Sequence, residues 1–471
     1  MGIGDIADQI ARVFDDTRAG AREMTEPVIR LGVTGLSCSG KTVFITSLVA
    51  NLLDRGRMPQ LQPAAEGHIV AAFLQPQPDD TVPRFEYETH LAALTGNNPH
   101  WPTSTRSISQ LRLSLRLRPK GMLASMRGAK TVHLDIVDYP GEWLLDLPLL
   151  NQSYAEWSDK TLQQAGSPAR ASLAEGWLAQ LEASDPAAPH DEPIAQSLAK
   201  VFTQYLHKSR KAGYSGFAPG RFLLPGDLQG SPALTFAPLP RPAKPRQGML
   251  YTEFQRRYES YKKRVVKPFF RNHFAKIDRQ IVLVDALGAI HSGPQAVEDL
   301  RSAMADVLTC FRPGKNHWLS GITGKKVEKI LFAATKADHL HHTQHPQLTG
   351  MLEALLRDAK DRADFRGATT QAMSIAALRA TVEQRVNHEG TDIDCVRGTG
   401  ADGKEIAMHP GDLPDDPAHL LAPARQGAAK WLDAEFNTVQ FAPPVLTRKR
   451  GDGLPHIRMD KAVQFLIGDR L

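Results

Sequence analysis

The chain has 471 residues, of which 42% are hydrophobic and 23% charged, and its formal net charge is +6. This is the composition of a globular protein with two to four domains, and its mild basicity is not evidence for a nucleic-acid partner. No run of about 18 apolar residues predicts a transmembrane helix, and three scattered cysteines exclude a disulfide framework or a cysteine zinc site, so we expect a cytoplasmic protein.

The N-terminal segment, residues 1–24, begins with an amphipathic pattern over residues 1–20. Its apolar residues recur at helical spacing, and they are Ile3, Ile6, Ile10, Val13 and Phe14. We expect this helix to pack on the body of the protein. A peripheral contact with the inner membrane is the alternative, and the four aspartates of the segment weaken it.

A strand over residues 28–33, a glycine-rich loop and a helix over residues 43–53 come next. The loop sequence GLSCSGKT, residues 35–42, fits the phosphate-binding pattern G-x-x-x-x-G-K-[ST]. Backbone N–H groups at the start of the helix would point at phosphate, Lys41 would reach the β- and γ-phosphates, and Thr42 would ligate Mg²⁺. The expected nucleotide contacts are Gly35, Ser37, Cys38, Ser39, Gly40, Lys41, Thr42 and Val43.

The pattern then alternates between strands and helices. Residues 59–105 look like a long irregular connection, and residues 111–118 and 131–137 like an antiparallel pair of strands. Helices are expected over residues 153–181, 194–212 and 250–270, with an irregular excursion over 219–245. The last helix is strongly basic, which indicates a packed or solvated helix or, alternatively, contact with an anionic membrane or acidic partner.

Regular α/β patterning resumes after residue 278. Strands are expected over residues 280–284, 329–334 and 368–375, and helices over 293–310 and 346–362. We therefore predict an α/β core built from residues 25–142 and 278–380, with a helical insertion over 143–277. Residues 381–471 look like an appended β-rich region with a closing helix over 460–465.

Two further motifs follow strands and narrow the choice of nucleotide. In the segment DYPG, Asp138 can hold Mg²⁺ through water and Gly141 can bring its N–H to the γ-phosphate. In TKAD, the carboxylate of Asp338 can accept hydrogen bonds from guanine N1 and N2, which adenine cannot offer. Lys336 can stack over the base, and Thr335 stands where asparagine is usual.

A third strand end, Ser374, Ile375 and Ala376, completes the expected nucleotide contacts. Ser374 and Ala376 can direct backbone N–H groups at guanine O6. The four histidines between residues 339 and 345 could suggest a metal, but no acid or cysteine near them in the sequence completes a site. We therefore interpret that stretch as an ordinary loop.

The ordered set of motifs resembles the phosphate-loop GTPases, and the details resemble the YcjX-like family of bacterial GTP-binding proteins. The segments that carry the resemblance are GLSCSGKTVF, WPTSTRSISQLRL, DYPGEWLLDLPLL, RQIVLVDAL, TKADH and HIRMDKAVQFLIGDRL. The resemblance implies a Ras-like core with large helical insertions, binding of GTP and GDP, Mg²⁺-dependent GTP hydrolysis, an association with stress responses and an unknown protein partner.

Ras-like GTPases also place a magnesium-sensing threonine between the phosphate loop and D-x-x-G. Thr103, Ser104 and Thr105 are the candidates, with Thr105 favoured, and Arg106 is either a finger supplied in cis or an ordinary surface arginine. Glu142 stands where the water-positioning glutamine is usual, so intrinsic hydrolysis is expected to be slow. The functional alternatives are an ATPase or phosphotransferase, and a nucleotide-stabilised scaffold at the membrane surface with little turnover.

Overall fold

The computed structural model describes residues 26–35, 39–103, 107–119, 129–216, 218–309, 327–362, 368–388, 390–428, 430–431, 436–447, 449 and 451–471. The predicted N-terminal helix lies outside the described residues. So do five of the residues considered for the site, which are Ser37, Cys38, Ser104, Thr105 and Arg106. In the part of the chain that is described, no helix combines the length and apolar character needed to cross a bilayer.

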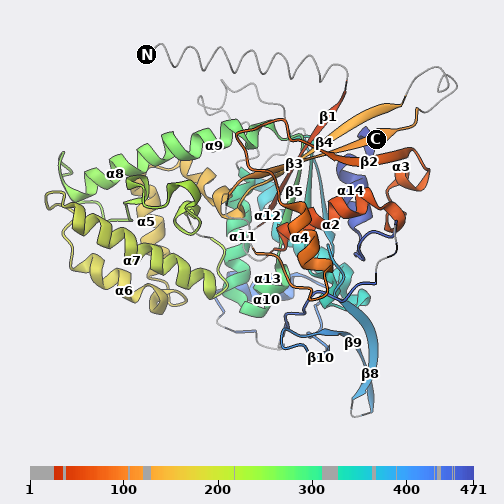
Figure 1. The fold of residues 1–471 in the computed structure, drawn as a ribbon. Coiled ribbons are helices and arrows are strands. Elements are labelled where there is room, and N and C mark those ends of the chain that lie inside the picture. Colours follow the sequence, from red (N-terminus) through yellow and green to blue (C-terminus); the bar gives the residue numbers. More distant parts are fainter. Residues whose placement is uncertain are drawn as a thin grey trace.

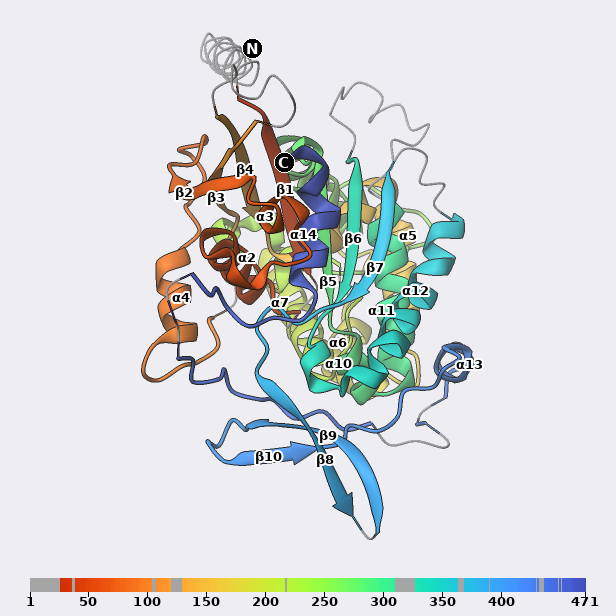
Figure 2. The ribbon, with the colours of Figure 1, turned by 90° about the vertical axis from the view of Figure 1, so that its right-hand side faces the viewer.

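A seven-stranded sheet in the order β2-β3-β4-β1-β5-β6-β7 forms the centre of the molecule (Figure 2). The strands are β1 (Val28–Gly35), β2 (Ile69–Gln75), β3 (Ser109–Leu117), β4 (Lys130–Asp138), β5 (Arg279–Val284), β6 (Lys329–Ala334) and β7 (Thr369–Ser374). Strands β4, β1, β5, β6 and β7 are parallel, whereas β3 runs antiparallel to β4 and β2 antiparallel to β3. This confirms the predicted α/β class and the predicted antiparallel pair.

The inner strands are buried on both faces, which explains their continuous apolar sequences. On β5, Ile281 and Leu283 pack with one core cluster and Val282 and Val284 with the other. Helices α2 (Lys41–Leu53) and α14 (Met459–Ile467) cover the first face, and α11 (Pro294–Thr309) and α12 (His345–Arg362) the second. Figure 2 shows α2 and α14 side by side in front of the sheet. The C-terminal helix is thereby part of the central core.

Most of the helical insertion lies to one side of the sheet (Figure 1). Its helices are α5 (Tyr154–Ala165), α6 (Ala171–Glu182), α7 (Glu192–Lys211), α8 (Leu250–Tyr261) and α9 (Lys267–Asn272). Aromatic rings fill its interior, as where Trp157 and Tyr258 stack with ring centroids 5.1 Å apart. The helix predicted over residues 153–181 is two helices, because Pro168 lies in the turn between them and proline disrupts a helix interior.

The prediction of an irregular connection over residues 59–105 was wrong. It contains α3 (Gln62–Ala65), the edge strand β2 and α4 (Tyr87–Thr95). The strand escaped notice because the sequence IVAAFLQ has no strict alternation, and Val70 and Phe73 of this edge strand are exposed. The basic helix also continues past Pro268 to Asn272, through a π-helical turn over Lys262–Val266.

The C-terminal region includes a second sheet that projects from the core (Figure 1). Its strands are antiparallel and are β8 (Thr381–His388), β9 (Thr391–Thr399) and β10 (Glu405–Met408). The helices α10 (Ala286–Ser292) and α13 (Ala418–Arg425) were not predicted. Both are short, which makes their periodicity hard to detect.

Candidate functional site

The predicted motifs meet at one edge of the central sheet. Five neighbouring parallel strands end there, and Gly35, Asp138, Asp285, Thr335 and Ser374 lie at or directly after their carboxyl ends. Open α/β sheets bind ligands in the crevice outside the carboxyl ends of their strands. This edge is therefore where a nucleotide is expected.

The phosphate loop turns from β1 into α2 through glycines. Gly40 adopts φ +77°, and a Cβ at Gly35 would lie 2.1 Å from Ser39 Oγ and 2.9 Å from the Leu283 carbonyl oxygen. The Ser39 hydroxyl is buried and has no hydrogen-bond partner among the described residues. A buried polar group without a partner is costly, so this hydroxyl is suited to contact a ligand.

Lys41 and Thr42 begin α2 and face the end of β4. Lys41 Nζ lies 3.9 Å from Asp138 Oδ1, and these side chains are 11% and 1% exposed. Thr42 is buried beside them and is followed by Val43 in the first turn of the helix. At a helix N-terminus, an ammonium group suits a nucleotide phosphate, and hydroxyl and carboxylate oxygens beside it suit Mg²⁺.

The segment after Asp138 forms a 3₁₀ segment, η3 (Gly141–Asn151), that carries Glu142. Glu142 is buried, and its Oε1 lies 3.0 Å from Nη2 of Arg210 on α7. The helical insertion thus supplies a positive partner for the carboxylate in the expected water-positioning place. The sequence carries no signal for this pairing, because the two residues are far apart in the chain.

Later segments of the insertion also contact η3, at Asp146 and at the backbone of Glu142. Asp146 accepts hydrogen bonds from the Gly220 N–H and the Tyr261 hydroxyl, both at 2.6 Å. Burial raises the pKa of Asp146 to about 6, although these bonds and Arg221 oppose the shift. A Cβ at Gly220 would lie only 1.8 Å from the carbonyl oxygen of Glu142. Any movement of η3 must therefore be shared with the insertion.

The T-K-x-D motif lies at the end of β6. Lys336 adopts φ +61°, and its Nζ lies 2.5 Å from Asp285 Oδ2, at the end of β5. The other oxygen of Asp285 accepts the Gly288 N–H and caps α10. The Thr335 hydroxyl donates to the Val284 carbonyl, 3.3 Å away. Asp285 therefore positions Lys336, a role that its place in the RQIVLVDAL segment did not indicate.

Asp338 is buried close to the start of β8. Its Oδ2 accepts the Ala380 N–H at 2.8 Å, and the Thr381 hydroxyl donates to its carbonyl oxygen. The Ala380 bond orients the carboxylate, and the Thr381 bond holds the backbone of Asp338. The small sheet is thus attached directly to the residue expected to recognise guanine.

The Ser374–Ala376 loop is held by neighbouring segments. The N–H groups of Ser374, Ile375 and Ala376 donate to Thr349 Oγ1, the Ala334 carbonyl and the Ile457 carbonyl, at 3.2, 2.8 and 3.1 Å. Because Ser374 and Ala376 already have these partners, their contact with guanine O6 stays a prediction.

Arg458 supports this loop from the C-terminal segment. Its Nη1 donates to the carbonyl and hydroxyl oxygens of Ser374, at 3.1 and 3.0 Å, and its Nη2 lies 3.0 Å from His345 Nδ1. Burial and then Arg458 lower the pKa of His345, which favours the neutral imidazole that can accept this bond. Arg458 lies in the segment HIRMDKAVQFLIGDRL, whose pattern did not indicate this role.

Comparisons with known proteins agree with this arrangement. The model of the YcjX-like family (DUF463) matches residues 29–471. The chain belongs to the YcjX-like family. A relative from Escherichia coli (strain K12), named Ras-like GTPase YcjX, is 39% identical over 456 residues, which cover 94% of this chain and 96% of the relative. A relative of the same name from Shewanella oneidensis (strain MR-1) is 36% identical over 494 residues, covering 100% of both chains.

Membership of the YcjX-like family confirms the resemblance, and the fold is consistent with a Ras-like GTPase. The candidates for the magnesium-sensing threonine lie near the end of the segment 39–103. Thr103 is exposed at the end of a described segment, and Trp101 Nε1 donates to the Phe441 carbonyl at 2.7 Å. Thr105 and Arg106 lie outside the described residues, so their roles stay predictions.

The histidine stretch has a partner in the fold that the sequence did not indicate. In the sequence no neighbouring acid completes a site with His341 and His342, yet the fold brings Glu383 of β8 against both rings. Glu383 could not be recognised as a partner from the sequence, because it lies about 40 residues further along the chain, in the small C-terminal sheet.

Proposed function

We propose that this chain is a Mg²⁺-dependent GTPase that works as a nucleotide-dependent conformational switch. The observation that carries the proposal is the meeting of Lys41, Thr42 and Asp138 with Lys336 and Asp338 at one sheet edge. The first three suit a triphosphate, and the last two suit a guanine base. The names of the two relatives, both Ras-like GTPases, support the same activity.

Nucleotide binding uses the loop, the start of α2 and the ends of β4 and β6. N–H groups of the phosphate loop cradle the phosphates, and Lys41 exchanges its contact with Asp138 for the β- and γ-phosphates. Thr42 and, through water, Asp138 would hold Mg²⁺, which would neutralise charge on the phosphate oxygens. The Asp338 carboxylate, oriented by the Ala380 N–H, accepts the N1 and N2 protons of guanine.

Hydrolysis depends on positioning a water molecule against the γ-phosphate. Glu142 accepts a hydrogen bond from this water, and the Gly141 N–H donates to the γ-phosphate. The guanidinium of Arg210 offsets the charge that Glu142 brings to a site that must stabilise negative phosphate oxygens. Because a carboxylate is less suitable here than an amide, the intrinsic rate is slow.

Switching uses the contact between η3 and the insertion. When Gly141 engages the γ-phosphate, η3 moves, and the bonds of Asp146 to Gly220 and Tyr261 carry this movement from η3 into the later helices of the insertion. Family resemblance alone indicates a setting in bacterial stress responses and an unidentified protein partner.

Single-turnover phosphate release tests the proposal. The purified full chain is mixed with limiting GTP in Mg²⁺ or in EDTA, and the variant Lys41→Ala serves as the inactive control. We expect phosphate release only with Mg²⁺. The rate of release should fall roughly 10²–10³-fold in the variant, as it does when an enzyme loses one hydrogen-bond donor to a developing negative charge. Tight GTP binding without phosphate release would instead identify a nucleotide-stabilised scaffold.

A further inference from the structure

Two histidines after the T-K-x-D motif face a glutamate of the small sheet. His342 Nδ1 lies 2.7 Å and His341 Nε2 3.7 Å from the same oxygen, Glu383 Oε2. One ligand atom from each of the three residues lies within 4.8 Å of the other two. Four-coordinate zinc, with bonds of about 2.0–2.1 Å, places its ligand atoms roughly 3.3–3.4 Å apart. Small side-chain rotations therefore suffice to surround an ion.

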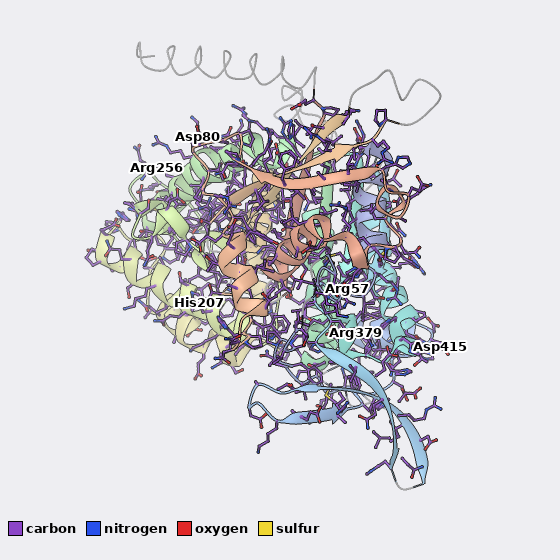
Figure 3. The ribbon with its side chains drawn as sticks, turned by 45° about the vertical axis from the view of Figure 1, so that its right-hand side comes forward. Arg57, Asp80, His207, Arg256, Arg379 and Asp415 are labelled. Carbon is purple, nitrogen blue, oxygen red and sulfur yellow. The ribbon has the colours of Figure 1, made fainter. Side chains whose placement is uncertain are left out.

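The second carboxylate oxygen of Glu383 is already engaged. Arg379 Nη2 lies 3.6 Å from Oε1, which leaves Oε2 directed at the imidazoles. Figure 3 shows Arg379 where the small sheet leaves the core, close to the start of β8. Carboxylates that ligate metals are usually oriented by such a partner on the remaining oxygen.

His341 is oriented in the same way. Its Nδ1 lies 2.9 Å from Thr343 Oγ1 and 3.5 Å from Asp394 Oδ2, and Arg385 holds the other oxygen of Asp394 at 3.0 Å. A carboxylate only accepts hydrogen bonds, so it favours the tautomer with the proton on Nδ1. That tautomer leaves the Nε2 lone pair facing Glu383. Carboxylate, histidine and metal in series are a recurring arrangement in zinc proteins.

We propose that His341 Nε2, His342 Nδ1 and Glu383 Oε2 bind a divalent transition metal, with zinc as the best match. Two imidazoles and one carboxylate are a known three-residue zinc set, with the fourth position left to water. The His342 side chain is 63% exposed, so water and the ion can both reach the site. This ion is separate from the Mg²⁺ of the nucleotide site.

The ion joins the loop after Asp338 to β8. The two residues at the root of this strand, Ala380 and Thr381, already hydrogen-bond to Asp338. A metal between His341, His342 and Glu383 would add a second attachment between the same two segments and restrict their separation. This consequence rests on the proposed function, and it predicts slower release of GDP when the metal is bound.

Cobalt(II) is the probe, because four-coordinate Co²⁺ has strong visible absorption bands. The tag-free full chain, stripped with EDTA and saturated with GDP and Mg²⁺, is titrated with Co²⁺ and then with Zn²⁺. We expect one equivalent of four-coordinate Co²⁺, displaced by Zn²⁺. Glu383→Gln and His342→Gln should abolish the band, and Asp394→Asn should weaken affinity roughly 10–100-fold through its effect on His341.

His388→Gln is the matched control, because His388 is exposed at the far end of β8. It should bind Co²⁺ like the unmodified chain. Absence of the band in the unmodified chain, or an equal band in Glu383→Gln, would overturn the metal site. Release of a fluorescent GDP analogue with and without Zn²⁺ tests the coupling, and equal rates would overturn that part. Failure of GTP hydrolysis with an intact Co²⁺ band would count against the proposed function only.

Discussion

The contact between η3 and the later segments of the insertion leads to a quantitative prediction about Asp146. Burial raises its pKa from 3.8 to about 6 in the folded chain. Between these values the folded state holds a proton that the unfolded state releases, so the free energy of unfolding falls as pH rises. The change is about 1.4 kcal/mol per pH unit, or roughly 3 kcal/mol across the whole window.

The variant Asp146→Asn removes this dependence. The asparagine side chain can still accept the Gly220 N–H, and the Tyr261 hydroxyl can reverse and accept from the amide, so both contacts survive. Between pH 5 and pH 7.5, the unmodified chain should lose about 1.4 kcal/mol of stability relative to the variant.

Urea unfolding, followed by tryptophan fluorescence and circular dichroism at both pH values, measures this difference. Asp159→Asn, at an exposed position on α5, is the matched control and should follow the unmodified chain. Parallel pH dependence in the unmodified chain and Asp146→Asn would show that Asp146 does not titrate near pH 6. That result would refute the inference that a buried carboxylate, only partly stabilised by its hydrogen bonds, joins η3 to the later segments of the insertion.

Three further changes test the site. Glu142→Ala should lower kcat for GTP by roughly 10–100-fold with little effect on GDP affinity, and equal kcat would exclude a role in positioning water. Arg210→Ala should lower kcat in the same direction, because it leaves Glu142 buried without its cation, and Arg210→Lys should restore part of the rate. Arg458→Ala should weaken GDP binding about tenfold, since it releases Ser374, and fluorescence titration that finds no change would contradict this.

Much of the central fold was predictable because its signals are local. The phosphate loop, the buried strands β5 and β6 and the antiparallel pair β3 and β4 follow from glycine placement and apolar periodicity within short segments. The edge strand β2 was missed because its exposed residues, Val70 and Phe73, are themselves apolar. Its identity as a strand depends on pairing with β3, which is a tertiary property.

The partners of the site residues could not be predicted for a related reason. Arg210, Asp285 and Arg458 act through contacts with Glu142, Lys336 and Ser374, respectively. Each partner comes from another part of the chain, and charged residues are common, so no spacing distinguishes it beforehand. The glutamate beside the two histidines was missed for the same reason, because it is distant from them in the sequence. Motifs identify the atoms that meet a ligand, whereas the groups that orient them become visible only in the fold.

The central claim is guanine specificity through Asp338, and competition for a bound fluorescent GDP analogue tests it most directly. GTP and GDP should displace the analogue at least about 100-fold more effectively than ATP, since adenine cannot supply the two donors that the carboxylate accepts. Asp338→Asn should lose this preference and favour xanthine nucleotides, which carry an oxygen where guanine carries its amino group. Displacement by ATP as effective as displacement by GTP, or an unchanged preference in Asp338→Asn, would contradict the account.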